Sequence, residues 1–387
     1  MMTLDRVTQV LADLVRIASV NPALVPGGAG EERIARYVAN FLQSAGFETH
    51  LQEISPGRFN AIGVLRGSGG GRSLMLNGHL DTVGVAGMEE PYSARIESGQ
   101  LYGRGAQDMK GGVAAALVAA ESLASGPPLP GDVIVAGVAD EEFQSAGTRA
   151  LLAGSAKSDA AIVMEPTGLQ VVTTHKGFAW AEVETFGRAA HGSRPQEGLD
   201  AIALMGRVLV EIERLGKALS GGPTHPLLGH GSVHASLIAG GQELSSYPAH
   251  CRLSLERRLV PGEDIATLEA ELAGILEKLR SLDPDFRGRF TLGYWARPLE
   301  TPPDIDLVQT VAWSARRVLG RKTDLGTQSF WTDAALLSEA GIPSVLFGPS
   351  GSGLHSTQES VNLDTVLACA RVLADCAKSF CGNSTSL

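Results

Sequence analysis

The sequence has only four cysteines, no run of basic residues and no apolar stretch long enough to cross a membrane. Three of the cysteines fall in a predicted C-terminal helix, which matches neither a disulfide framework nor a zinc-ribbon spacing. A net charge of -10 without clustered Lys and Arg disfavours nucleic acid and anionic membranes as partners. The N-terminus is patterned as an amphipathic helix and not as a signal segment. We therefore expect a cytoplasmic protein.

The chain of 387 residues is longer than one hydrophobic core usually organises, so we expect two domains. Residues 1–175 alternate predicted helices and buried strands, which is typical of an α/β domain. From residue 176 the pattern changes to alternating strands and two helices, which predict a compact α+β unit over residues 176–294. The α/β pattern returns over residues 295–387. Because this last part carries His355, a candidate ligand, we interpret the middle unit as an insertion.

Residues 59–67 and 72–81 are two strand-like runs separated by a glycine-rich stretch. A phosphate-binding loop would need a helix after these glycines, whereas a strand follows them here. We therefore interpret the stretch as a hairpin turn that joins two strands.

Five possible metal ligands each lie at the end of an apolar run, and they are His79, Asp108, Glu142, Glu165 and His355. Three of them follow predicted buried strands, at the edge where open α/β sheets place their sites. Carboxylate oxygens together with imidazole nitrogens suit zinc, cobalt or manganese. Five such ligands suffice for two ions that share one bridging carboxylate, which is the composition of a hydrolytic centre.

Two further acids accompany these ligands. Asp81 lies two residues after His79 on a strand end, so both side chains point to one face and Asp81 can orient the imidazole. The alternative is a turn aspartate beside a core histidine. Glu141 and Glu142 would repel each other unless cations or protons compensate. We assign Glu142 as a ligand and Glu141 as the general base, against the alternative of a solvated charge cluster at a helix start.

Seven segments of the sequence resemble the metallopeptidase family of aminoacylases, acetylornithine deacetylases, succinyl-diaminopimelate desuccinylases and glutamate carboxypeptidases. They are GHLDTV, GRGAQDMKGG, ADEE, MEPT, AAHGSRPQEGLDAI, ERRLVPGE and GLHSTQE, and the resemblance covers nearly the whole chain. It implies an α/β fold with a zinc-exopeptidase-like catalytic domain and an inserted α+β domain that serves as a lid and dimerises.

The resemblance also implies roles for the candidate ligands. One zinc ion would be held by His79, Asp108 and Glu165. Asp108 would bridge to a second ion held by Glu142 and His355. The resemblance further implies that Glu141 is the base, that Asp81 is the orienter and that the peptide bond between Asp108 and Met109 is cis.

In the inserted domain the resemblance implies that His191 donates a hydrogen bond to the developing oxyanion and that Arg258 binds a substrate carboxylate. The alternatives are a turn residue for His191 and an ion pair with Glu263 for Arg258. Ser245 stands where many relatives carry a substrate-contacting asparagine, so the substrate of a particular relative does not transfer to this chain.

These observations predict a dinuclear metal-dependent hydrolase that cleaves the amide bond of an N-acyl amino acid or a similar carboxylate-bearing substrate. Zinc is the expected ion, with cobalt or manganese as alternatives, and we expect a homodimer. The alternative hypothesis is that the enzyme is a carboxypeptidase or dipeptidase. A more remote hypothesis is a metal-binding relative that has lost catalysis, and the presence of both Glu141 and Asp81 argues against it.

Overall fold

A computed structural model describes residues 2–154 and 157–382. The chain divides into two compact units. The first consists of Met1–Thr173, Thr301–Gly326 and Thr332–Leu387, and the second of Thr174–Glu300 and Thr327–Trp331. The sequence placed the corresponding boundaries after residues 175 and 294.

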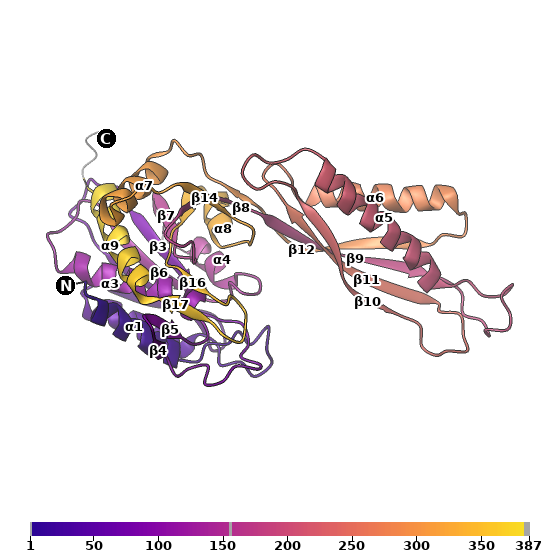
Figure 1. Cartoon of the computed structure of the whole chain (residues 1–387), viewed down its shortest axis with the longest axis horizontal. Helices are drawn as coiled ribbons and strands as arrows, with labels where there is room; N and C mark the ends of the chain where they lie inside the picture. The colour runs from indigo at the N-terminus through magenta and orange to yellow at the C-terminus, as the bar shows by residue number, and fades with distance from the viewer. Residues whose placement is uncertain (1, 155–156, 383–387) are drawn as a thin grey trace. The chain divides into compact units, whose positions relative to one another are not determined.

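The largest sheet is mixed, with the strand order β1-β2-β6-β3-β7-β15-β8-β13, and β14 also pairs with β8 (Figure 1). All of it except β13 and the last residues of β8 and β14 belongs to the first unit. Strands β3, β6, β7 and β15 run parallel to their neighbours within this group. The strand bounds are β1 Glu48–Ser55, β2 Arg58–Leu65, β3 Leu74–His79, β6 Val133–Val138, β7 Ala160–Val163, β8 Val171–His175, β13 Leu299–Glu300, β14 Leu325–Gln328 and β15 Ser344–Leu346.

Helices cover both faces of this sheet, because its central strands are apolar on both sides. Every residue of β3, β6 and β7 is buried. One face packs on α1 (Leu4–Arg16), α2 (Glu32–Ser44), α3 (Gly111–Ala124), α7 (Asp306–Leu319) and α9 (Leu363–Phe380). The shorter α4 (Ala146–Ala153) and α8 (Ala334–Glu339) also contact strands of the sheet. Asn362 and Thr3 cap the N-termini of α9 and α1 with their side chains.

The predicted hairpin between residues 59–67 and 72–81 is wrong. Strand β6 lies between β2 and β3, so these two strands are not paired. Strand β2 is antiparallel to β6 and β3 is parallel to it. The glycine-rich stretch therefore passes the end of β6 instead of closing a two-stranded turn. The hairpin is formed one strand earlier, where β1 pairs with β2 across residues 55–58.

A small antiparallel sheet also belongs to the first unit, with the order β16-β17-β5-β4. Its strands are β4 Arg95–Glu97, β5 Gln100–Tyr102, β16 Gly351–Ser352 and β17 Ser360–Asn362. The chain leaves β5 into a short irregular helix, η1 (Ala106–Lys110), which continues into α3. The predicted cis peptide between Asp108 and Met109 is present there.

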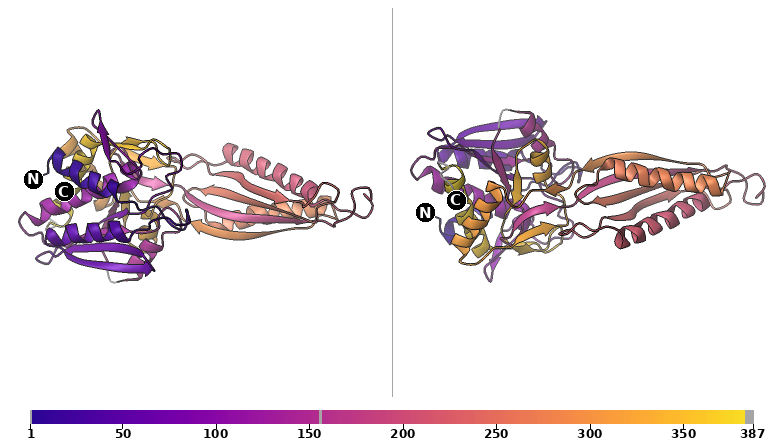
Figure 2. Two further views of the ribbon diagram at one scale, coloured as in Figure 1. Left: turned by 90° about the horizontal axis from the view of Figure 1, so that it is seen from below. Right: turned by 90° about the horizontal axis from the view of Figure 1, so that it is seen from above.

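The second unit is an antiparallel sheet covered on one face by two helices (Figure 2). The strand order is β10 (Ser232–Gly240), β11 (His250–Leu259), β9 (Gly177–Phe186) and β12 (Gly288–Ala296). Helices α5 (Ala201–Gly221) and α6 (Ile265–Leu282) bury their apolar sides against alternate residues of β9 and β11. The predicted strand and helix types of this segment are confirmed.

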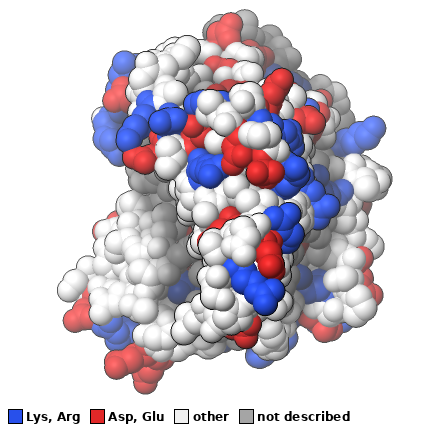
Figure 3. Space-filling view, turned by 90° about the vertical axis from the view of Figure 1, so that its right-hand side faces the viewer, with Lys and Arg blue, Asp and Glu red and all other residues white. Residues whose placement is uncertain are grey.

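Charges of both signs are interspersed over the face of the molecule shown in Figure 3. In the described part of the chain, no helix combines the length and the apolar character that a membrane crossing needs.

Candidate metal centre

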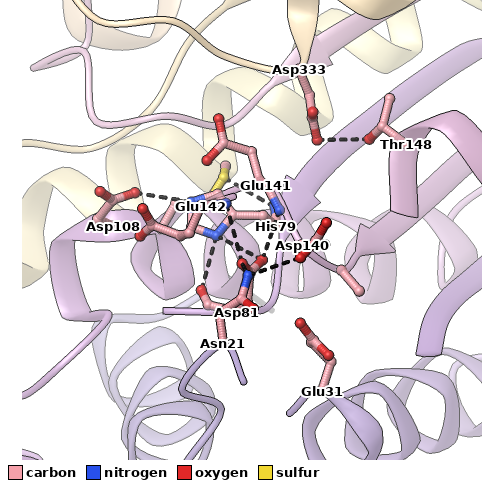
Figure 4. Close-up of polar contacts among 12 residues, drawn as sticks. Asn21, Glu31, His79, Asp81, Asp108, Asp140, Glu141, Glu142, Thr148 and Asp333 are labelled. Carbon is pink, nitrogen blue, oxygen red and sulfur yellow. Dashed lines mark hydrogen bonds and ion pairs between the residues drawn. The ribbon is translucent and has the colours of Figure 1, made fainter. Parts of the chain in front are cut away.

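Five strand ends and loops of the first unit bring the predicted ligands together, and Figure 4 shows three of these ligands with their surroundings. His79 is the last residue of β3, and Asp108 lies in η1 just before α3. Glu142 and Glu165 follow β6 and β7, and His355 lies between β16 and β17. The sequence placed His79, Glu142 and Glu165 after buried strands, as the structure does.

Asp108 lies between the two histidines. Its Oδ1 is 3.0 Å from Nε2 of His79, and its Oδ2 is 3.2 Å from Nε2 of His355. The same nitrogen of His355 is 3.2 Å from Oε2 of Glu142. Nε2 of His79 is 3.9 Å from Oε1 of Glu165. One carboxylate thus faces two imidazoles, each with a further acid at its side.

These contacts define two groups of possible ligands. Donor atoms of His79, Asp108 and Glu142 all lie within 4.8 Å of one another, and so do donor atoms of His79, Glu141 and Glu165. Glu141 is therefore as close to His79 as a ligand would be. This position suits an acid that works on a water molecule beside a bound cation.

The electrostatics of the site fit divalent cations. Burial raises the pKa of Glu165 well above its ordinary value, and repulsion from Asp108 raises it further. Burial also raises the pKa of Glu142, whose Oε1 is buried with no hydrogen-bond partner among the described residues. Two divalent cations would neutralise this crowded negative charge and give the free oxygen a partner. The mixture of oxygen and nitrogen donors suits zinc, cobalt or manganese.

The ring orientation of His79 is set by Asp81, through its backbone. Nδ1 of His79 lies 3.0 Å from the carbonyl oxygen of Asp81 and 3.6 Å from the carboxylate oxygen Oδ1. Because a carbonyl can only accept, Nδ1 carries the proton and Nε2 is left free to bind a cation. The sequence predicted that Asp81 orients this ring through its carboxylate, but 3.6 Å is too long for a hydrogen bond.

The Asp81 carboxylate instead holds the backbone of the two adjacent glutamates. Oδ1 accepts from the amide of Glu141 at 3.1 Å, and Oδ2 accepts from the amide of Glu142 at 3.2 Å. The side-chain nitrogen Nδ2 of Asn21 donates hydrogen bonds to Oδ2 of Asp81 at 2.8 Å and to Oδ1 of Asp140 at 3.1 Å. Sequence reasoning missed Asn21, because a lone asparagine 60 residues away carries no local signal.

A buried ion-pair cluster lies behind this carboxylate. Arg58 donates to Glu31 at 2.5 Å and to Asp140 at 3.0 Å. The side chain of Glu31 is fully buried, and that of Arg58 is only 12% exposed. Asp140 also accepts from the amide of Ala146, at the start of α4. The cluster therefore fixes the segment that carries Glu141 from the side away from the ligands.

Asp333 is a further buried acid, and no pattern in the sequence indicates it as part of the site. Its Oδ2 accepts from the hydroxyl of Thr148 at 2.6 Å, whereas its Oδ1 is buried without a partner among the described residues (Figure 4). Burial raises the pKa of Asp333 to about 6, although the hydrogen bond from Thr148 opposes the rise. Burial raises the pKa of Glu141 well above its ordinary value, and the charge of Asp333 adds to the rise.

The remaining predicted residues, His191, Ser245 and Arg258, belong to the second unit. His191 is exposed, and its Nδ1 accepts from the amide of Ser193 at 3.2 Å, so in the neutral ring Nε2 carries the proton. The carbonyl of Ser245, which is also exposed, accepts from the amide of Gly192 at 2.7 Å. His191 also forms an isolated β-bridge with Ser246, so it lies close to Ser245.

The alternative ion pair between Arg258 and Glu263 is wrong. Arg258 donates instead to Glu256 at 2.6 Å, with its guanidinium 5.5 Å from the ring centre of Phe178. Glu263 pairs with the neighbouring Arg257, whose side chain is fully buried. Alternation along β11 explains this difference, since Arg257 points into the core and Arg258 away from it.

Comparisons with known proteins identify the family of the chain. Residues 75–379 match the model of Peptidase family M20/M25/M40, and the chain belongs to this family. It is 32% identical to an acetylornithine deacetylase of Myxococcus xanthus over 359 residues, which cover 89% of this chain and 91% of that protein. It is 26% identical to an N-formyl-4-amino-5-aminomethyl-2-methylpyrimidine deformylase of Bacillus subtilis (strain 168) over 387 residues, which cover 92% of this chain and 91% of that protein.

Among solved structures, a tripeptidase from Staphylococcus aureus matches with a TM-score of 0.80 and 18% identity, over 98% of this chain and 99% of that chain. At this identity the likeness concerns the fold. The predicted fold class and family resemblance are confirmed. The chain is an amide-bond hydrolase of a metal-dependent family.

Proposed function

We propose that the protein uses two divalent cations to hydrolyse the amide bond of an N-acyl amino acid or a similar substrate with a free carboxylate. The observation that carries the proposal is the position of Asp108, whose two oxygens face His79 at 3.0 Å and His355 at 3.2 Å. One ion would be held by His79, Asp108 and Glu165. The other would be held by Asp108, Glu142 and His355.

Bound cations of this kind polarise a carbonyl and increase the acidity of water. The protein's own contribution begins with Glu141. This carboxylate takes a proton from the attacking water, whose oxygen forms the new bond to the carbonyl carbon. It returns the proton to the amine nitrogen as the carbon–nitrogen bond breaks. Hydrogen bonds from the backbone of Glu141 and Glu142 to Asp81 hold the main chain that carries this acid.

We further propose roles for three residues of the second unit. We assign to His191 the donation of a hydrogen bond from Nε2 to the developing oxyanion. Arg258 would bind the substrate carboxylate, because its planar guanidinium can form two parallel hydrogen bonds. To do so, Arg258 would break its hydrogen bond to Glu256 or divide its N–H donors between Glu256 and the substrate. Ser245 is proposed to line the substrate site on the same unit.

The acyl group and the amino acid are proposed only as a class. Similarity to a deacetylase and to a deformylase supports removal of a small acyl group. The alternative is a carboxypeptidase or dipeptidase, which releases a terminal amino acid. A panel of N-acyl amino acids and dipeptides, assayed with zinc, cobalt and manganese, separates the two. Cleavage of dipeptides without cleavage of any acyl-amino acid would contradict the deacylase proposal.

We further propose zinc as the physiological ion, a cytoplasmic location and a homodimer formed through the middle unit. Exposed apolar side chains on the outer strand β10 support this dimer, since Leu237 is 72% and Ile238 is 55% exposed. The mass of the protein in solution tests it. A monomer at micromolar concentration would contradict the proposal.

Glu141→Gln is the sharpest test of the proposed base. The amide cannot take a proton, so we expect turnover to fall by about 10²- to 10⁴-fold or more while two ions stay bound. Metal content by mass spectrometry and steady-state kinetics measure the two effects. Glu53→Gln, on an exposed position of β1, is the matched control. Near-normal turnover in Glu141→Gln would remove the base assignment, and absence of turnover in the wild-type protein on all substrates would favour a non-catalytic relative.

A further inference from the structure

Glu359 is a buried acid whose two oxygens each accept two hydrogen bonds. Oε2 accepts from Nη1 of Arg104 at 2.6 Å and from the amide of Gly105 at 3.0 Å. Oε1 accepts from the amides of Gln107 at 2.9 Å and Asp108 at 3.0 Å. Its side chain has no exposed surface. The Glu359 carboxylate therefore binds the backbone segment from Gly105 to Asp108, which is the proposed ligand between the two histidines.

The same acid follows His355 by four residues, so it also belongs to the loop of the second histidine. Arg104 strengthens this link, because its Nη2 donates to the carbonyl of Ser356 at 3.0 Å. The His355 ring is 54% exposed, and packing therefore does little to hold it. Its position relative to Asp108 depends on how firmly the two loops are bound to each other.

We propose that Glu359 is a positioning residue that binds the Asp108 loop to the His355 loop and so sets the geometry of the cation site these two ligands share with Glu142. The inference rests on the proposed dinuclear site. Carboxylates that accept several backbone amides are strong anchors, since each of these hydrogen bonds is charge-assisted. Loss of one acceptor allows the two loops to shift separately, and a cation that needs ligands from both loops then binds more weakly.

A purely structural role for Glu359 makes a different prediction. Strand β17 begins at Ser360 and pairs with β5, so Glu359 also adjoins the small sheet. If support of that sheet were its only role, substitution would lower stability without a selective effect on cation binding. Cation affinity measured on folded protein distinguishes the two roles.

Glu359→Gln is the primary variant, because glutamine keeps the size and one acceptor oxygen but turns the other atom into a donor. That donor would face Arg104 and the Gly105 amide, which are donors themselves. Calorimetric titration of the metal-free protein with zinc should show one ion bound with nearly normal affinity and the other bound about 10- to 100-fold more weakly. Excess zinc should restore part of the lost turnover.

Glu121→Gln is the matched control, since Glu121 is bound by both Nε and Nη2 of Arg6 at a site on α3 that carries no ligand. It should bind two zinc ions like the wild-type protein. Arg104→Lys keeps the positive charge but cannot donate to Glu359 and Ser356 at once, so it should lower the affinity for the same ion. This variant tests the proposal if Glu359→Gln does not fold. Wild-type affinity for both ions in a folded Glu359→Gln, or in Arg104→Lys, would overturn this inference. Fewer than two ions in the wild-type protein would instead contradict the proposed function.

Discussion

The carboxylate of Asp81 lies 3.1 Å from the backbone nitrogen of Glu141 and accepts its hydrogen. The acid that we propose as the base is therefore held through its main chain by a residue at the end of the neighbouring strand β3. The same carboxylate accepts from the amide of Glu142. Asp81 thus links three functional positions, because its carbonyl also accepts from the ring of His79.

Asp81→Asn should lower turnover by about 10- to 100-fold, the usual effect of losing a supporting hydrogen bond at a metal site. Asparagine keeps one acceptor oxygen, but its NH2 group would face a backbone amide that is itself a donor. Steady-state kinetics and bound-metal content measure the loss. Asp304→Asn, at an exposed position, is the control and should change neither. Wild-type turnover in Asp81→Asn would show that the support of Glu141 and Glu142 does not matter for the reaction.

Much of the site could be predicted from the sequence because its signals are local. His79, Glu142 and Glu165 each follow a short apolar run, and buried parallel strands produce such runs wherever they end. The supporting residues gave no such signal. Asn21, Arg58 and Glu359 act on partners 60, 82 and 251 residues away, and no pattern within one segment encodes that distance.

The same reason explains the wrong hairpin between β2 and β3. A glycine-rich connection between two strand-like runs fits a hairpin locally, but strand order in a mixed sheet depends on which other strands compete for each edge. Here β6 lies between β2 and β3 and pairs with both. The hydrogen bonds from Glu141 and Glu142 to the Asp81 carboxylate could not be predicted for a similar reason, because spacing on one strand says nothing of the amides that a neighbouring strand end presents.

Arg58→Ala should be strongly destabilising, by about 3–5 kcal/mol, because it leaves the buried acids Glu31 and Asp140 without their cation. Urea unfolding measures the change in free energy. Arg66→Ala is the matched control, since Arg66 also pairs with two acids but is 60% exposed, and it should lower the free energy of unfolding far less than Arg58→Ala. Equal losses in the two variants would show that burial of the Arg58 cluster is not what gives it its effect.

Gly112→Ala should also destabilise the first unit. Helix α3 passes so close to the end of β7 that a Cβ on Gly112 would lie 2.0 Å from the carbonyl oxygen of Met164, next to Glu165. The helix or the strand end must move, at a cost of about 1–3 kcal/mol. Gly206 in α5 has no atom within 4 Å of such a Cβ. Gly206→Ala should therefore stabilise the protein by about 0.5–1 kcal/mol, and the same sign of change in both variants would contradict the close approach.

Removal of the cations should lower the melting temperature more at high pH than at low pH. Without metal, hydrogen bonds to Asp108 and Glu142 raise the pKa of His355 from 6.5 to about 10, and burial raises the pKa of Glu165 well above its ordinary value. Each group then binds a proton more tightly in the folded state than in the unfolded state. The stability that these two groups contribute to the metal-free protein is therefore fully present below their ordinary pKa values, and it is lost as pH rises towards the raised ones.

A bound cation reverses this preference, because it needs a neutral imidazole and ionised carboxylates. The gain in melting temperature on adding zinc to chelator-treated protein should therefore grow from about pH 6 to about pH 8, and differential scanning fluorimetry measures it. His355→Ala should reduce this growth, whereas His234→Ala, at an exposed position on β10, should leave it unchanged. A gain that stays constant or shrinks as pH rises would mean that these groups do not release protons to a metal, and the assignment of His355 and Glu165 as ligands would fail.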